Sequence, residues 1–215
     1  MIPRIRGELK ETIMKFITSA LASTFLVASL ATAHAEPAQP DVAKLVSPEL
    51  INQIQEFISA EIVTISVQAQ NARLTDLSQD KIDELDNQWK AEREATDKPL
   101  IAATLSSPLS VYLARIQGKS LGLFPEIFVM DQNGLNVGQS SITSDFWQGD
   151  EGKFQKTYDV SETAIFIDEA EWDDEMKIWR NQVSMTLVDS GKKKIGAVTV
   201  ELNLTELERR ALAGS

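Results

Sequence analysis

The stretch Glu126-Ile-Phe-Val-Met-Asp-Gln-Asn-Gly-Leu-Asn-Val-Gly138 decides the fold. A compact apolar run ends at Asp131, the triplet Gln132-Asn133-Gly134 is a tight-turn signal, and the apolar pattern then resumes. Because Asn-Gly turns join neighbouring antiparallel strands, the stretch predicts a β-hairpin. Three further strand patterns follow, at Ala164–Trp172, Trp179–Val188 and Ile195–Leu202. The sequence therefore predicts a mostly antiparallel sheet of about five strands.

The chain before this hairpin has the pattern of helices. Ser47-Pro48-Glu49 combines an N-cap, a proline at the first helical position and an acidic first turn. From there isoleucines recur at spacings of three and four, which predicts one long amphipathic helix ending near Arg73. Further helices are expected over Asp80–Glu94, over Pro99–Ile116 with an interruption near Ser107-Pro108, and over Thr205–Leu212. This order predicts a single α+β domain over residues 47–212, with the long N-terminal helix packed on the sheet.

Residues 1–35 have the layout of a secretory signal peptide. A basic start at Met14-Lys15 precedes the apolar stretch Phe16–Leu30, and Ala33-His34-Ala35 is a small-x-small cleavage site. The apolar stretch is shorter than the roughly 18–20 residues of a membrane-spanning helix. We therefore expect export to the periplasm, a mature form that does not span the membrane, and a flexible leader over residues 36–46. Residues 1–13 fit a mis-assigned start, and an uncleaved membrane anchor is the alternative.

The composition excludes several classes of function. The chain of 215 residues has no cysteine, and its single histidine, His34, lies inside the expected signal peptide. A mature form without these side chains has no histidine-dependent triad and no ordinary zinc or iron site. The formal net charge of −11 argues against nucleic acid as a partner, because that affinity depends on Lys and Arg. We expect no enzymatic activity, no cofactor and no metal.

A polar and aromatic segment follows the hairpin and is the first candidate for a ligand site. It places Asp145, Trp147, Gln148 and Asp150 close together, beside Phe146. Apolar walls with a few orienting polar groups are typical of small-molecule pockets, so we predict that these four residues bind a ligand. The alternative is that the two aromatic side chains only pin the segment onto the sheet.

The strand Trp179–Val188 is the second candidate. Its alternation directs Arg180, Gln182, Ser184 and Thr186 to one face and apolar side chains to the other. If the polar and aromatic segment covers this polar face, Arg180 and Gln182 line the floor of a cavity. Otherwise the face is solvated surface. Because a guanidinium binds both oxygens of a carboxylate, Arg180 favours a carboxylate-bearing small molecule as the ligand.

The run Asp168-Glu-Ala-Glu-Trp-Asp-Asp-Glu175 is strongly acidic. Calcium takes oxygen ligands alone, so the run could hold Ca²⁺ without histidine or cysteine. A solvated hairpin edge that resists pairing with other chains explains the charge equally well. The sequence leaves both explanations open.

Three stretches resemble the PDC/Cache family of extracytoplasmic sensor domains: Met130–Val137, Thr143–Glu151 and Lys194–Asn203. The resemblance covers about residues 48–207. Within it, the run from Ser144 to Glu151 is similar to a free-standing, exported subgroup. The arginine-tryptophan-tyrosine motif of the family's amino-acid-binding branch is absent, so amino-acid specificity is not implied.

This resemblance implies a PAS-like fold and a soluble periplasmic module that binds a small molecule. It also implies a part in signal transduction, through a membrane receptor or a sensor kinase as the partner. The alternative function is a structural or interaction protein that docks a partner through its N-terminal helices.

Overall fold

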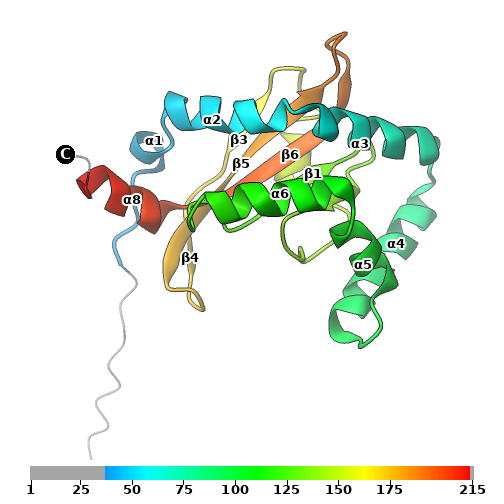
Figure 1. The fold of residues 1–215 in the computed structure, drawn as a ribbon, viewed down its shortest axis with the longest axis horizontal. Coiled ribbons are helices and arrows are strands. Elements are labelled where there is room, and N and C mark those ends of the chain that lie inside the picture. The colour runs from blue at the N-terminus through cyan, green and yellow to red at the C-terminus, as the bar shows by residue number, and fades with distance from the viewer. Residues whose placement is uncertain (1–36, 214–215) are drawn as a thin grey trace, which may run out of the picture. The chain divides into compact units, whose positions relative to one another are not determined.

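Helices occupy most of the chain before the hairpin, and four of the strands follow it, in the computed structural model, which describes residues 37–213 (Figure 1). The helices are α1 (Val42–Leu45), α2 (Pro48–Ile58), α3 (Glu61–Arg73), α4 (Gln79–Glu94), α5 (Pro99–Leu105), α6 (Pro108–Lys119), α7 (Gly152–Gln155) and α8 (Leu204–Ala213). The strands are β1 (Ile127–Met130), β2 (Asn136–Gln139), β3 (Ile165–Ile167), β4 (Glu171–Asp173), β5 (Ile178–Val188) and β6 (Lys194–Asn203). The expected signal peptide and its cleavage site lie outside the described residues.

The described strands form one antiparallel sheet, which confirms the predicted α+β fold. The strand order is β2-β1-β6-β5-β3, and β4 also pairs with β5. The strand expected over Ala164–Trp172 is divided into β3 and β4. Between them Asp168 still donates its backbone N–H to Gln182, but its carbonyl accepts the side-chain amide of Asn181 instead of a backbone N–H. The ladder is therefore interrupted there.

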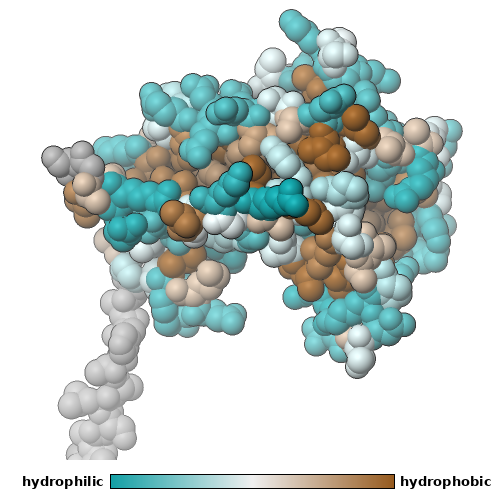
Figure 2. All heavy atoms as spheres, in the orientation of Figure 1, coloured by the Kyte–Doolittle hydropathy of each residue, from teal (hydrophilic) through white to brown (hydrophobic). Residues whose placement is uncertain are grey.

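One face of the sheet packs against α2, α3 and α6 and forms the main hydrophobic core (Figure 1). Ile54 of α2, Val67 of α3 and Leu113 of α6 are fully buried in it. Figure 2 shows hydrophilic residues over the outward sides of α2 and α6, with hydrophobic residues visible in the seam between these helices. The predicted packing of the N-terminal helical region on the sheet is confirmed.

The single long N-terminal helix is not observed as predicted, because it is broken between α2 and α3. Ala60 has an extended backbone, with a ψ of 136°. The hydroxyl of Ser59 donates to the carbonyl of Glu56, at 2.7 Å. From α6, the hydroxyl of Tyr112 donates to the carbonyl of Phe57, also at 2.7 Å. These bonds satisfy carbonyl groups that a continuous helix would satisfy internally, so α2 can end here.

The break also shifts the buried face of the second helix. The isoleucine pattern continues through Ile62 and Ile65, but the buried residues of α3 are Val63, Val67 and Gln70. Ile65 is 52% exposed. One residue outside helical geometry rotates every later side chain about the helix axis, so the periodicity of the sequence no longer reports which side faces the core.

Part of the expected leader is helical. The turn α1 ends just before Val46, which is buried in the main core. The predicted cap at Ser47 is present, since its hydroxyl accepts the backbone N–H of Leu50 at 3.3 Å. Among the described residues, no single helix is long and apolar enough to cross a membrane. One pair of described helices, α5 and α6, reaches that length and hydrophobicity together, but it is bent by 66° between them.

Candidate functional site

The polar and aromatic segment, residues 143–151, lies along the free edge of the β-hairpin. We call it the covering segment. The N–H of Asn136 donates to the carbonyl of Phe146, and the N–H of Gln148 donates to the carbonyl of Gly134. Gly134 has a φ of +80°, and a Cβ there would lie 2.6 Å from the Cα of Gly149. The Asn-Gly turn therefore permits the close approach of the segment as well as the hairpin itself.

Helix α4 holds the covering segment from its other side. One oxygen of Asp86 accepts the backbone N–H groups of Phe146 and Trp147, at 2.9 and 3.1 Å. The indole of Trp89 donates to the carbonyl of Thr143 at 3.0 Å and stacks on the ring of Phe146. The predicted aromatic pair thus belongs mainly to a hydrophobic cluster with α4 and α5.

A cavity of about 1180 Å³ lies over the face of the sheet opposite the main core. Its floor includes Phe128, Arg180, Gln182 and Glu201, which come from β1, β5 and β6. The covering segment contributes Gln148, and α7 contributes the side chain of Lys153. Cavities that hold small ligands usually measure roughly 300–1,000 Å³, so this one has room for a ligand and associated water.

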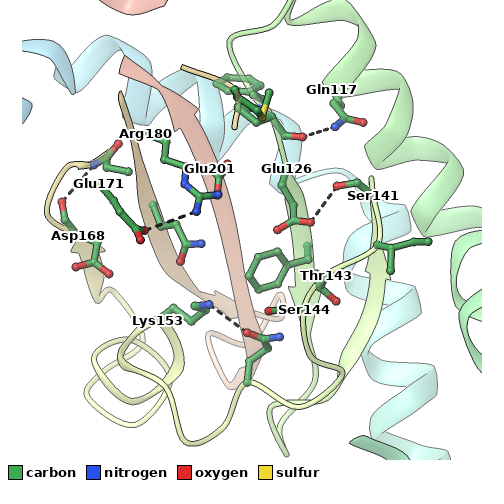
Figure 3. A pocket seen from close by; sticks show the side chains of 18 of the residues that line it. Gln117, Glu126, Ser141, Thr143, Ser144, Lys153, Asp168, Glu171, Arg180 and Glu201 are labelled. Atoms are coloured by element: carbon green, nitrogen blue, oxygen red, sulfur yellow. Dashed lines mark hydrogen bonds and ion pairs between the residues drawn. The ribbon is translucent and has the colours of Figure 1, made fainter. Parts of the chain in front are cut away.

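Two carboxylates on neighbouring chain segments face this cavity. Glu126 directly precedes β1, and its carbonyl accepts the backbone N–H of Glu201 on β6 at 2.8 Å. Burial raises the pKa of both carboxyl groups, and their mutual repulsion adds to the increase for Glu126. Hydrogen bonding from Ser141, at 2.9 Å, opposes the shift at Glu126. Figure 3 shows both side chains directed into the same space.

Arg180 is surrounded by carboxylates. Its guanidinium lies 3.4 Å from Glu201, 3.5 Å from Asp173 and 3.8 Å from Glu171. The three partners come from β6 and β4, the two strands that flank β5 at this end of the sheet. An arginine with three counter-charges within ion-pair distance has little positive potential left for an anionic ligand.

Lys153 of α7 is the cation that faces these groups from the opposite side of the cavity (Figure 3). Its ammonium lies 2.8 Å from Glu151 and donates to the side-chain carbonyl of Gln148 at 3.2 Å. It also lies 5.4 Å from the centre of the Phe128 ring. A carboxylate, an amide oxygen and an aromatic face therefore surround one ammonium group.

The structure brings three of the six predicted site residues together. Gln148, Arg180 and Gln182 line the cavity, with Gln148 reaching it from the covering segment as the sequence interpretation required. Arg180 and Gln182 on the polar face of β5 thus line the same cavity as Gln148 of the covering segment.

The other three predicted residues do not line the cavity. Asp145 forms an ion pair with Lys90 of α4 at 2.9 Å. Burial alone would raise the pKa of Asp145, but hydrogen bonds from Ser144 and Lys90 lower it. The indole of Trp147 donates to the carbonyl of Asn133 at 2.8 Å, and Asp150 is exposed. Hydrogen bonds to α4 and to the hairpin orient the segment. Of its four predicted residues, only Gln148 therefore faces the cavity.

Sequence reasoning missed Glu126, Lys153 and Glu201. The signal for Glu201 was available, because it alternates with the apolar residues of β6 just as Gln182 alternates with those of β5. Glu126 precedes its strand, and Lys153 lies on a helix of a single turn. No periodicity in the sequence indicates which way those two side chains point.

The acidic run of residues 168–175 contributes ion pairs and turn bonds. Asp173 and Glu171 face Arg180, and Asp174 pairs with Lys177 at 2.6 Å. One oxygen of Asp173 also accepts the N–H groups of Glu175 and Met176 in the turn to β5. Within residues 37–213, no three carboxylates gather in an arrangement that could hold a metal ion.

Of the comparisons with known proteins, only the one with solved structures found proteins similar to this chain. No protein-family model matches the chain, and no curated protein matches it. The ligand-binding domain of the Campylobacter jejuni chemoreceptor Tlp3, in complex with 4-methylisoleucine, is 13% identical with a TM-score of 0.37. The alignment covers 72% of this chain and 65% of that one.

Two other solved structures are similar to the same degree. The ligand-binding domain of the Pseudomonas aeruginosa amino-acid chemoreceptor PctC, in complex with GABA, is 13% identical (TM-score 0.34), with 68% of this chain and 60% of that chain covered. The sensor domain of the V. cholerae histidine kinase DctB is 15% identical (TM-score 0.35), with 78% and 58% covered.

All three are sensory domains, the kind of protein that the sequence resemblance led us to expect. This chain spans less than two thirds of the length of each. TM-scores below 0.5 carry no argument about what this chain binds, so the functional proposal has to stand on its own residues.

Proposed function

We propose that this chain is a non-enzymatic sensor module that binds a small molecule in the cavity between the sheet and the covering segment. We also propose that it acts in the periplasm after cleavage before Glu36, and that a membrane receptor or sensor kinase is its partner. The sequence supports the export step through the Ala33-His34-Ala35 motif.

One observation carries the proposal of ligand binding. Polar side chains from β5 and β6 line the same cavity as Gln148 of the covering segment. Gln182 and Glu201 lie opposite each other across the two strands and both reach the cavity. Convergent polar groups in a concave site are the usual signature of specific small-molecule binding.

The covering segment offers a route from the ligand to a partner. Its Gln148 lines the cavity, whereas its neighbour Trp147 is hydrogen-bonded to Asp86 of α4. A ligand that moves Gln148 would therefore act on α4, which has a mostly exposed and charged outer side. We propose that α4 and the covering segment form the element that reports occupancy.

Thermal unfolding of the purified exported protein against a panel of small metabolites tests this function. A ligand present at a hundred times its dissociation constant stabilises the folded state by about 2.7 kcal/mol, an easily measured shift of the midpoint. Gln182→Ala should abolish the shift, which is measured against the midpoint of each variant without ligand because Gln182 also hydrogen-bonds to Glu201. Gln53→Ala, an exposed position on α2 that lines no cavity described for residues 37–213, is the control.

Two results would count against the proposal. If no compound shifts the midpoint, the cavity is not a binding site. If a compound acts equally on the parent and on Gln182→Ala, it binds elsewhere. Intact-mass analysis of the periplasmic fraction tests export separately, with Glu36 expected as the first residue.

A further inference from the structure

The charges that line the cavity are unbalanced. Seven carboxylates line it, against three cationic side chains: Arg93, Lys153 and Arg180. Arg180 is already engaged by three carboxylates, and Arg93 donates to the carbonyl of Ser144. The cavity therefore has an excess of negative charge that the protein itself does not neutralise, which favours a cationic occupant.

Glu126 is a largely buried carboxylate of the cavity that forms no ion pair within residues 37–213, and the charges that favour its ionised form are the more distant ones of Lys153 and Arg180. Its side chain accepts a hydrogen bond from Ser141. It also lies beside a second carboxylate, Glu201, whose own partner is Arg180. A largely buried carboxylate without a close counter-ion is costly, and a bound cation would remove this cost.

The surroundings of Lys153 show which kind of chemical group the cavity can bind. Its ammonium sits between Glu151, Gln148 and the face of Phe128, at 2.8, 3.2 and 5.4 Å. The side chain of Lys153 is only 13% exposed. An ammonium of the protein thus already occupies a cage of carboxylate, amide oxygen and aromatic ring, which is the environment that binds an ammonium group of a ligand.

We infer that the ligand of this cavity is an organic cation with an ammonium group, that Glu126 is its anionic anchor, and that the ammonium of Lys153 competes with it for the cavity. This inference rests on the proposed function, namely that the cavity binds a small molecule. It departs from the carboxylate ligand expected from the sequence, because Arg180 is neutralised within the fold. Displacement of Lys153 would move α7 and so couple the ligand to the covering segment.

Three probes with carbon chains of equal length test the sign of the ligand's charge: pentylamine, 1,5-diaminopentane and pentanoate. Calorimetric titration and thermal unfolding of the exported protein are the measurements. We expect the two amines to bind and to raise the unfolding midpoint, and pentanoate to do neither. The experiment is repeated at raised salt concentration, where a partly buried ion pair should weaken less than surface attraction.

Two substitutions separate the roles of the anchor and the competitor. Glu126→Gln keeps the size and the partner Ser141 but removes the charge, and it should weaken amine binding at least about tenfold. Lys153→Gln removes the competing ammonium, and it should tighten amine binding by about three- to tenfold. The matched controls are Glu208→Gln on α8 and Lys156→Gln, which changes an exposed lysine one residue beyond α7.

Each outcome decides between the inference and the proposed function. Binding of pentanoate that Lys153→Gln abolishes would overturn the inference but leave a ligand-binding module. The same holds if neither amine binds while another compound of the metabolite panel does. Equal loss of amine binding in Glu126→Gln and Glu208→Gln would mean that only the net charge of the protein matters. It would overturn the assignment of Glu126 as the anchor. If no compound of any charge binds, both the inference and the proposed function fail.

Discussion

The two faces of the β5–β6 pair are built from alternate residues of the same two strands, yet they differ in packing. On the core face, Val183 lies opposite Val200 and Met185 lies opposite Val198. All four are buried against the helices and their neighbours, with none exposed by more than 3%. Apolar area removed from water at this density stabilises the fold, so this face holds the domain together.

On the cavity face the same ladder pairs polar residues. Gln182 lies opposite Glu201, and Ser184 lies opposite Thr199, with 3.0 Å between the two hydroxyls. These polar side chains form hydrogen bonds across the strand pair, between Ser184 and Thr199 and between Gln182 and Glu201. A period of two residues therefore separates the surface that stabilises the protein from the surface that we propose binds a ligand.

The largest expected effect breaks the core face. Leu113 of α6 is fully buried, and Leu113→Ala should lower the free energy of unfolding by about 2–5 kcal/mol through lost burial and the cavity left behind. Val111→Ala, on the exposed side of the same helix, should cost much less. Urea unfolding of both variants measures the difference. Equal losses would mean that α6 is not part of the core as described.

A pair of neighbouring substitutions sharpens the comparison on a single strand. Val200→Thr adds a hydroxyl to the dry core face and should cost about 1–3 kcal/mol in the free energy of unfolding. Thr199→Ser, one residue away on the cavity face, keeps the hydroxyl that pairs with Ser184 and should cost no more than about 1 kcal/mol, because it loses only one methyl group. The reverse order of these two values, measured by urea unfolding, would contradict our assignment of the faces.

The next prediction concerns the cover of the cavity face. Gly134→Ala places a Cβ 2.6 Å from the backbone of Gly149 at a position with positive φ. We expect a stability loss of about 1–2 kcal/mol, with the core intact and the covering segment displaced. Hydrogen exchange at residues 144–151 should increase, while exchange in β5 and β6 should not. Gly118→Ala, where the added Cβ meets nothing within 4 Å, is the control.

The smallest expected effect is a pH dependence of the cavity face. Burial raises the pKa of Glu126 above its ordinary value of 4.5. The folded state therefore holds this proton more tightly than the unfolded state. Its contribution favours folding below about pH 4.5 and is lost as the pH rises through the folded-state pKa. Glu126→Gln should accordingly be more stable than the parent at neutral pH, by no more than about 1 kcal/mol.

Thermal unfolding from acid to neutral pH measures this effect. The gap between Glu126→Gln and the parent should close as the pH falls towards the ordinary value for glutamate. A gap that is constant with pH would show that the carboxylate of Glu126 is already compensated in the folded protein. Stability gained by the same change that removes a ligand's anchor would be typical of a binding site.

The sequence by itself determined the local elements and the two-sided character of the sheet. The cap at Ser47, the Asn-Gly hairpin and the alternation of β5 are all found where the residues predict them. Each is encoded within a few consecutive residues, because capping bonds, turn geometry and strand pleating act over that distance. The α+β class follows from the order of these elements.

Only the tertiary structure decided which of the polar residues share a site. Tyr112 from another helix stabilises the end of α2 and so shifts the buried face of α3. Asp86 fixes the covering segment so that Trp147 turns away from the cavity, and Gln148 turns into it. The strand order then places Glu126 next to Glu201, although 75 positions separate them in the sequence. Contacts between residues so far apart depend on the packing of the whole domain, which no local pattern specifies.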